Sequence, residues 1–357
     1  MLLQRSKVKE DRSFLIRSRQ IGRIFADMRV PLDHWYPLLE SRELKRRPLG
    51  LQRLGRRFVF WRTADGRAHA HADRCPHLGA ALSGGTVCED RLVCPFHGFA
   101  FDADGACRLM PAAGRDATIP QGMAVARFEV REAHGFIWLW WGATRATYPD
   151  LPWFPEFDAP GWRWSTTTVD WPVHYTRAIE NQLDVAHLAF VHRTTIERGG
   201  RSRVHGPHVE ADAHGIKVWT TNTIDDGTPE PSREALAEAA AARPPSLHFL
   251  FPGVWRLVIS PSLKNLVAFV PIDATTTRYY LRVYHRYRNP LVARPFEWLM
   301  NLSNRFVLGQ DRRVVITQTP PDSLDAGDDR LIGADRAIVQ FRRLLAKMLR
   351  DGEAPPL

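Results

Sequence analysis

Residues 74–102, RCPHLGAALSGGTVCEDRLVCPFHGFAFD, contain two short segments of similar composition. Each segment places one thiol close to one imidazole, Cys75 near His77 and Cys94 near His97, and a proline follows each cysteine. A glycine-containing stretch separates the two segments. Two thiolates and two imidazoles form a ligand set that suits either zinc or an iron–sulfur cluster. The pattern therefore predicts that these four residues bind one metal group.

The order of the ligands distinguishes the two kinds of metal site. Structural zinc sites usually pair two cysteines in one motif and two histidines in another. Here each motif supplies one of each, as Cys-x-His, sixteen residues, and Cys-x-x-His. This order resembles the Rieske [2Fe–2S] site, in which two histidines replace two cysteines on one iron. The resemblance implies that Cys75 and Cys94 bind one iron and that His77 and His97 bind the other. Structural zinc remains the alternative.

The other cysteines refine the resemblance. Rieske proteins of respiratory complexes typically have two more cysteines, which join the two loops by a disulfide. The corresponding positions here are Ala80 and Phe96, so the segment is more similar to the Rieske domain of oxygenases. Cys88 and Cys107 have no neighbouring histidine, and we expect them to be small buried residues.

A second group of candidate ligands lies in residues 180–195, ENQLDVAHLAFVHRTT. Asp184 and His187 are one helical turn apart and should share a helix face. His187 and His192 are five residues apart, which at about 100° per residue does not return to the same face. The helix should therefore loosen or end between the two histidines, which would let both imidazoles reach one metal ion.

Two histidines and one carboxylate form the facial triad of non-haem Fe(II) oxygenases. The chain resembles the α-subunits of Rieske non-haem iron oxygenases over residues 34–320, and in this family the carboxylate comes from a late helix. The segment RFVLGQDRRVVITQ fits that place, so Asp311 is the candidate ligand. Asp322 and Asp325 are competing carboxylates nearby.

The same resemblance assigns roles to residues around these histidines. It implies that Asp184 lies between a Rieske histidine of one subunit and an iron-ligating histidine of the next, where its carboxylate would orient and connect both imidazoles. Asn181, one turn earlier, is a candidate residue near the iron, although a plain polar helix residue is equally credible. His174 is assigned to packing or pocket lining.

The fold expected from these patterns is α+β with two domains in 357 residues. Residues 1–33 form a basic N-terminal extension. Residues 34–145 read as short strands separated by Gly and Asp turns, which predicts an all-β domain, and a proline-dense connection follows. Residues 146–350 mix strands with helices. The resemblance implies a Rieske β-sandwich followed by a helix-grip domain, an antiparallel sheet with helices and the mononuclear iron in its mouth.

The resemblance also implies a function. The chain would use O2 and electrons from a separate reductase or ferredoxin to hydroxylate or oxidatively demethylate an organic, ring-containing substrate. Its size and motifs resemble those of α-only monooxygenases and demethylases, which favours a monooxygenase over a dioxygenase. The subunits would form a head-to-tail ring, most often a homotrimer. A Rieske electron-transfer protein without its own oxygenase activity is the rival interpretation, and a zinc-stabilised binding module is a third.

Net charge and hydropathy restrict the partners. The formal net charge is +10, and many basic residues lie in the first 60 positions. A solvated basic face is the simpler interpretation, and a docking surface for an acidic protein partner is the alternative. No sequence motif suggests nucleic-acid binding. The longest apolar run, at residues 136–143, is too short to span a bilayer, and the N-terminus lacks the apolar block of a secretory signal. We therefore expect a cytoplasmic protein.

Overall fold

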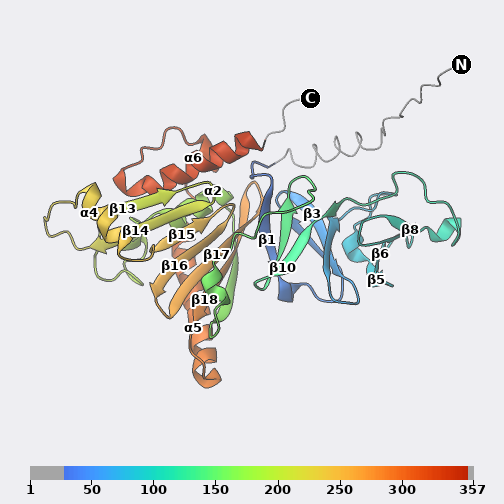
Figure 1. Ribbon diagram of the computed structural model, residues 1–357, viewed down its shortest axis with the longest axis horizontal. Helices are drawn as coiled ribbons and strands as arrows, with labels where there is room; N and C mark the ends of the chain where they lie inside the picture. Colours follow the sequence, from blue (N-terminus) through green and yellow to red (C-terminus); the bar gives the residue numbers. More distant parts are fainter. Residues whose placement is uncertain (1–27, 353–357) are drawn as a thin grey trace, which may run out of the picture.

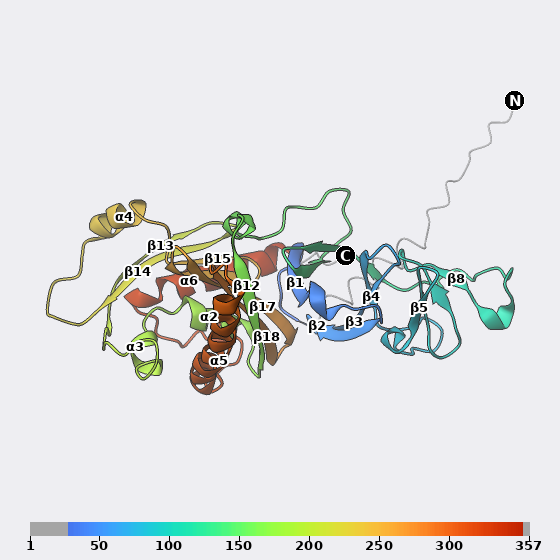
Figure 2. The same cartoon turned by 90° about the horizontal axis from the view of Figure 1, so that it is seen from below.

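The computed structural model describes residues 28–352, so most of the predicted basic extension lies outside the described residues. Two β-rich parts lie side by side along the long axis of the molecule (Figures 1 and 2). The N-terminal part consists of small sheets, and the C-terminal part is one large sheet with helices. The predicted α+β class is confirmed.

Three small antiparallel sheets form the N-terminal domain. The first, in the order β1-β11-β10, contains β1 (His34–Glu40), β10 (Val130–Ala133) and β11 (Phe136–Trp141). The second, β2-β3-β4-β9, contains β2 (Leu49–Arg53), β3 (Arg56–Arg62), β4 (Ala68–Ala72) and β9 (Arg127–Phe128). The third contains β5 (Thr86–Cys88), β6 (Arg91–Val93), β7 (Ala100–Phe101) and β8 (Cys107–Leu109). The third sheet and the loops beside it carry the first cysteine–histidine group.

A seven-stranded antiparallel sheet forms the centre of the C-terminal domain, in the order β12-β18-β17-β16-β15-β14-β13. Its strands are β12 (Arg163–Trp171), β13 (Arg203–Ala211), β14 (Gly215–Thr223), β15 (Leu247–Leu250), β16 (Val254–Ser260), β17 (Leu263–Asp273) and β18 (Thr276–His285). The helices are α2 (Tyr175–Leu183), α3 (Leu188–Val191), α4 (Arg233–Ala241), α5 (Pro290–Val315) and α6 (Arg336–Asp351). Helix α6 lies along one side of the sheet, and α5 projects from the body of the domain (Figure 1).

The two faces of this sheet have different neighbours. Tyr279 of β18 donates a hydrogen bond to the carbonyl of Ala178 in α2, at 3.3 Å. The next residue, Tyr280, points to the opposite face and donates to Glu43 of the N-terminal domain, at 2.8 Å. We call the face that carries Tyr279 the inner face and the one that carries Tyr280 the outer face. The inner face therefore packs on helices, and the outer face packs on the N-terminal domain.

Arg282 fixes the outer face to the N-terminal domain. Its side chain is fully buried, and its Nη2 lies 2.9 Å from the Glu40 carboxylate. The guanidinium also donates to the carbonyls of His134 and Gly135, at 2.6 and 2.9 Å. It lies 3.6 Å from the ring centre of Phe136, a cation–π distance. One side chain thus bonds to the end of β1 and to the turn between β10 and β11, which lie at the same end of the first small sheet.

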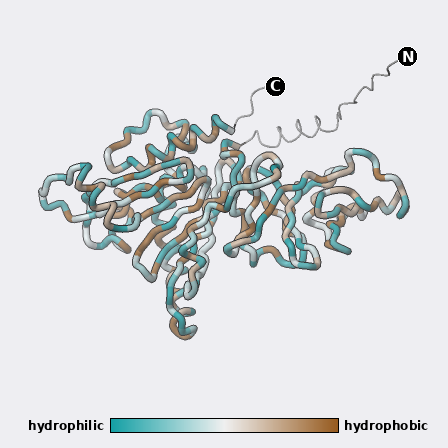
Figure 3. The backbone as a smooth tube through the Cα atoms, in the orientation of Figure 1, coloured by the Kyte–Doolittle hydropathy of each residue, from teal (hydrophilic) through white to brown (hydrophobic). Residues whose placement is uncertain are grey.

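Apolar residues follow the strands of both domains (Figure 3). The segment RRFVFWR was expected to be a strand and coincides with β3. Strand β12, in RWSTTTVDW, was not predicted, because its residues are mostly half-buried and it follows a proline-dense stretch. Residue 145, the predicted domain boundary, lies in the connection between β11 and β12. No helix in residues 28–352 combines the length and the apolar character needed to cross a bilayer.

Two candidate metal centres

The two cysteine–histidine segments form loops with matching backbone hydrogen bonds. The N–H of Cys75 donates to the carbonyl of Ala80, at 2.8 Å, and the N–H of Cys94 donates to that of Phe99, at 2.8 Å. Each bond joins two residues that are five positions apart. The two segments that are alike in sequence therefore also form similar loops.

A glycine closes each loop. Gly79 and Gly98 both lie four residues after a cysteine and donate to its carbonyl, at 2.9 and 3.0 Å. Their φ angles are +78° and +70°, a region that residues with a Cβ atom rarely adopt. These glycines allow the chain to turn back sharply, which leaves the cysteine and histidine side chains on the same side of each loop.

The side chains of these loops form a buried thiol pair and an outward imidazole pair. Cys75 and Cys94 are each 2% exposed, and burial, together with the neighbouring thiol, raises the pKa of Cys75. The Nδ1 atoms of His77 and His97 lie 3.2 Å apart. Two nitrogens bound to one metal at about 2.1 Å are separated by about 3 Å. The imidazole pair therefore fits one shared metal ion, and a metal would also stabilise the thiolates.

This donor set fits a cluster with two metal positions better than a single zinc ion. A tetrahedral zinc site keeps its ligand atoms within about 4 Å of one another. Within residues 28–352, the ligand atoms of His187, His192 and Asp311 lie within 4.8 Å of one another, and no such close group includes residues of the two loops. The four ligands of the loops are therefore spread more widely than a single zinc ion requires.

The break in the helix before the second histidine group differs from the prediction. Helix α2 ends at Leu183, and Asp184 already has an extended backbone (φ −68°, ψ 126°). The expectation that Asp184 and His187 lie on one helix was therefore wrong. Helix α3 is a single turn between His187 and His192. The chain breaks before the first histidine because the Asp184 carboxylate accepts from the N–H groups of Ala186 and His187, at 2.7 and 3.2 Å.

Helix α5 brings Asp311 to both histidines. One oxygen of Asp311, Oδ1, lies 3.0 Å from Nε2 of His192 and 3.5 Å from Nε2 of His187. Asp311 and His192 are buried, and the His187 side chain is 13% exposed. Two imidazoles and a carboxylate that converge in this way match the ligand set of a non-haem iron site.

Gln310 orients His192, a contact that the sequence analysis missed. Its Oε1 lies 3.0 Å from Nδ1 of His192 and accepts a hydrogen bond from the Thr195 hydroxyl, at 2.9 Å. An acceptor at Nδ1 holds the proton there and leaves the Nε2 lone pair for a metal. The only signal in the sequence is that Gln310 directly precedes Asp311. Burial lowers the pKa of His192, but the hydrogen bond and charge of Asp311 outweigh this and raise it.

Asn181 and Asp184 lie on either side of this group. The amide of Asn181 donates to Oδ1 of Asp311, at 3.4 Å. Oδ2 of Asp184 is 3.7 Å from Nδ1 of His187, which is too long for a hydrogen bond, and this buried nitrogen has no other partner. Burial raises the pKa of Asp184, but the neighbouring His187 and backbone N–H groups outweigh this and lower it. Asp184 is therefore a partly exposed carboxylate next to an imidazole whose Nδ1 atom is buried.

The competing carboxylates lie elsewhere. Asp322 and Asp325 both pair with Arg29, each at 2.5 Å. His174 lies 3.7 Å from Asp322 and hydrogen-bonds Thr176, at 2.8 Å. None of these residues belongs to the group around Asp311, so His174 is a packing residue, as expected.

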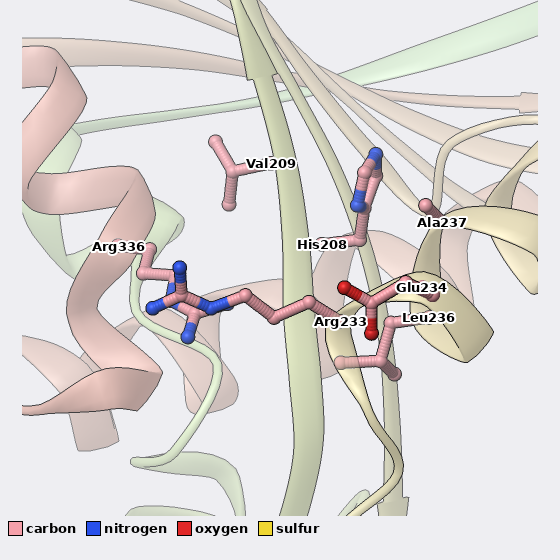
Figure 4. A pocket seen from close by; sticks show the side chains of 7 residues that line it. All are labelled: His208, Val209, Arg233, Glu234, Leu236, Ala237 and Arg336. Atoms are coloured by element: carbon pink, nitrogen blue, oxygen red, sulfur yellow. The ribbon is translucent and has the colours of Figure 1, made fainter.

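A cavity of about 360 Å³ lies at the β13 edge of the large sheet, away from both groups (Figure 4). It contains none of the candidate ligands. Its lining residues come from β13, α4 and the start of α6: His208, Val209, Arg233, Glu234, Leu236, Ala237 and Arg336.

Comparisons with known families agree with this two-part organisation. Residues 34–129 match the Rieske [2Fe-2S] domain, and residues 171–351 match the vanillate O-demethylase oxygenase C-terminal domain. Together they define a two-domain protein of the Rieske oxygenase class, whose cofactors are a [2Fe–2S] cluster and a mononuclear non-haem iron. The chain belongs to the Rieske non-haem iron oxygenase family, and the zinc alternative is wrong.

Individual relatives cover different shares of the chain. Methylxanthine N1-demethylase NdmA of Pseudomonas putida is 27% identical over 340 residues, 91% of each chain. The matched region spans only 30% of the TIC 55 protein of Pisum sativum, at 35% identity over 46% of this chain. The structure of Pseudomonas putida NdmA with caffeine superposes with a TM-score of 0.71 at 24% identity, covering 94% of this chain and 98% of that one. This structural likeness confirms the fold.

Proposed function

We propose that this chain is the oxygenase component of a Rieske monooxygenase or demethylase. Cys75, His77, Cys94 and His97 would hold the [2Fe–2S] cluster, and His187, His192 and Asp311 would hold Fe(II). The observation that carries the proposal is the convergence of two imidazoles on one buried carboxylate oxygen, at 3.0 and 3.5 Å, in a chain that also contains a Rieske domain.

When bound, the cluster supplies single electrons and the mononuclear iron supplies a site where O2 is activated. The residues of the chain prepare this site. Gln310 fixes the tautomer of His192, and Asn181 donates to the Asp311 oxygen that faces both histidines. The substrate would be an organic compound with a ring, because relatives such as methylxanthine N1-demethylase and vanillate O-demethylase are named for such compounds.

We propose a head-to-tail homotrimer in which the cluster of one subunit serves the iron of the next. The Rieske loops lie at one end of the molecule, and α3 and α5 lie away from them in the C-terminal domain (Figures 1 and 2). Exposed apolar side chains accompany both sites: Leu78 and Phe96 flank the Rieske histidines, and Phe190 follows Asp184 by six positions. Contact between these surfaces would bury them and bring Asp184 to a Rieske histidine of the neighbour.

The electron donor is proposed to be a separate reductase or ferredoxin. Within the basic first 60 positions of the chain, a groove is lined by Glu43, Lys45, Arg46, Arg47, Pro48 and Leu49. Its excess of positive charge would attract an acidic donor. A cytoplasmic location without a membrane or nucleic-acid partner stays a prediction from the sequence.

Iron analysis of protein purified without oxygen tests the proposal. We expect about three iron atoms per chain, two in the cluster and one in the facial triad. The rival interpretation, a Rieske electron-transfer protein without oxygenase activity, predicts about two. A content of two, with no product formed when a reductase, O2 and ring-containing candidate substrates are supplied, would favour the rival.

A further inference from the structure

Within the described part of the C-terminal domain, three side-chain amides have a buried atom without a hydrogen-bond partner: those of Asn265, Asn304 and Gln340. Gln340 belongs to α6. The other two are Nδ2 of Asn304, a donor on a buried residue, and the side-chain oxygen of Asn265, an acceptor on a half-buried residue. Buried polar atoms are nearly always paired, and each exception needs an explanation. Because nothing within the described chain satisfies these atoms, the partner we consider is a bound molecule.

Asn304 lies on the face of α5 that carries the proposed iron ligand. Asn304, Leu308 and Asp311 are spaced by four and three residues and are all buried, so they point to the same side of the helix. Seven residues of helix separate Asn304 from Asp311 by about 10 Å along the axis. A ring-containing substrate close to the iron would extend over a comparable distance.

Asn265 lies on the inner face of the sheet, which faces these helices. Along β17, Asn265 alternates in phase with Phe269, which contacts the inner-face residue Tyr279 at 5.1 Å. Asn265 pairs in register with Val283, and Val283 pairs with Ser165. The Ser165 hydroxyl donates to Asn301 of α5, at 3.4 Å. The two unpartnered amides therefore both face the layer between the sheet and α5, Asn265 from the sheet and Asn304 from the helix.

The charge of this layer restricts the ligand. Among the described inner-face positions of β12, β16, β17 and β18, Arg163 is the only arginine or lysine. Its guanidinium is already paired with Glu297, at 3.1 Å. A carboxylate would therefore find no free cation on this wall. A neutral amide could accept from Nδ2 of Asn304 through its carbonyl and donate to the Asn265 oxygen through its N–H.

We propose that Asn265 and Asn304 are substrate-binding residues that select a ring compound with a neutral polar group over one with a carboxylate. This inference rests on the proposed function and names its substrate class. Each asparagine amide can both donate and accept, so together they can hold a group such as a ring amide or lactam from two sides. The unpaired amides lower the stability of the free protein, and the substrate would restore the missing hydrogen bonds.

The test uses two small probes of nearly equal shape, benzamide and benzoate. The chain is loaded with Co(II) at the mononuclear site, and binding is followed by the paramagnetic relaxation of the probe protons, without any electron donor. We expect benzamide to bind near the metal at least about 10-fold more tightly than benzoate. Asn304→Leu and Asn265→Leu should each weaken benzamide by about 10-fold, the equivalent of one hydrogen bond.

Thermal stability provides a second readout, with Asn301→Leu as the matched control on the same helix. Asn301 is satisfied, because it accepts from Thr167 at 2.9 Å as well as from Ser165. Its replacement should lower the Tm, whereas Asn304→Leu and Asn265→Leu should leave the Tm unchanged or raise it by about 2 °C. A fall in Tm for both of these variants, like that of Asn301→Leu, would assign them a structural role and overturn the inference.

The failure of this inference can be told apart from the failure of the proposed function. If Co(II) does not bind and His187→Ala changes nothing, the metal site itself is wrong. If Co(II) binds but benzoate binds as tightly as benzamide, or if benzamide does not bind, only the assignment of Asn265 and Asn304 is wrong.

Discussion

At the scale of single residues, the carboxylate of Asp311 is the group that turns two neighbouring histidines into a candidate metal site. Replacing Asp311 by alanine should remove the mononuclear iron and leave the cluster intact, so the iron content should fall from about three to about two atoms per chain. The measurement is iron analysis together with the visible spectrum of the cluster.

Asp322→Asn is the matched control for Asp311→Ala. Asp322 is a nearly buried carboxylate close to a histidine, but it pairs with Arg29 and lies outside the candidate site. This variant should keep the full iron content. Loss of iron from Asp322→Asn, with retention in Asp311→Ala, would reverse the assignment of the ligand.

His71 makes the stability of the N-terminal domain depend on pH. It is fully buried, accepts from Trp61 Nε1 at 2.9 Å, and lies 3.2 Å from the Ala103 carbonyl. Burial lowers the pKa of His71 to about 4. In the unfolded chain this imidazole is protonated below about pH 6.5, whereas in the folded chain it stays neutral down to about pH 4. The free energy of unfolding therefore falls by up to about 3 kcal/mol as the pH falls from 6.5 to 4.

Replacing His71 by glutamine should flatten this pH dependence, because glutamine can still accept and donate a hydrogen bond but does not titrate. The comparison is the thermal unfolding midpoint at pH 7.5 and pH 5 for both proteins. His214→Gln, at an exposed histidine, is the control and should keep the slope of the parent. An unchanged slope in His71→Gln would show that other groups govern the acid sensitivity.

The residues of the candidate sites differ in how far the sequence could predict them. The cysteine and histidine loops are local, so short spacing alone indicates their chemistry. Asp311 lies more than a hundred positions after His192, and only the family resemblance pointed to it. Gln310 could not be predicted, because a hydrogen bond between a helix and a distant imidazole leaves no periodic pattern. The ligand roles themselves stay predictions until metal is measured.

At the scale of elements, strand β18 connects the two domains through Arg282. Arg282→Met should lower the free energy of unfolding by about 3–5 kcal/mol, because the buried Glu40 carboxylate would lose its buried counter-ion and keep only the exposed Arg42, and the carbonyls of His134 and Gly135 would lose their donor. Arg278, on the same strand, forms a more exposed pair with Asp170, at 2.7 Å. Arg278→Met should therefore cost less than about 1 kcal/mol.

Chemical denaturation followed by tryptophan fluorescence and by cluster absorbance gives both values. A loss in Arg282→Met no larger than in Arg278→Met would contradict the view that Arg282 holds the domains together. Earlier unfolding of the N-terminal domain alone would instead show that the interface supports mainly that domain.

Elements with strong apolar patterns were predictable, and elements set by tertiary contacts were not. The run RRFVFWR forms β3 because both of its faces are covered. Strand β12 has no clear alternation, and it exists because β18 pairs with it along its whole length. The helix break was placed too late, because the cap formed by the Asp184 side chain competes locally with helix continuation.

At the scale of the whole molecule, the proposed electron path can be tested with mixed oligomers. His187→Ala chains would keep the cluster but lack the mononuclear iron, and His97→Ala chains would lack the cluster. If electrons cross between subunits, an oligomer assembled from both variants should reoxidise its reduced clusters with O2 faster than either variant alone. The measurement is the visible absorbance of the cluster after mixing with oxygen.

Equal rates in the mixed and single-variant oligomers would contradict transfer between subunits. A control mixture of His187→Ala with a second iron-site variant, Asp311→Ala, should show no gain, because neither partner could accept the electron.

The two faces of strands β17 and β18 contact different parts of the molecule. Tyr280 and Arg282 hold the N-terminal domain against the outer face, while Tyr279, one position away, packs on the helix before the iron ligands. Within one chain, the sheet therefore separates the N-terminal domain from the helices that carry the candidate iron ligands. For the proposed sites, we expect a single subunit to be unable to pass electrons from its own cluster to its own iron. Transfer would require the Rieske loops of a neighbouring subunit to lie beside Asp184.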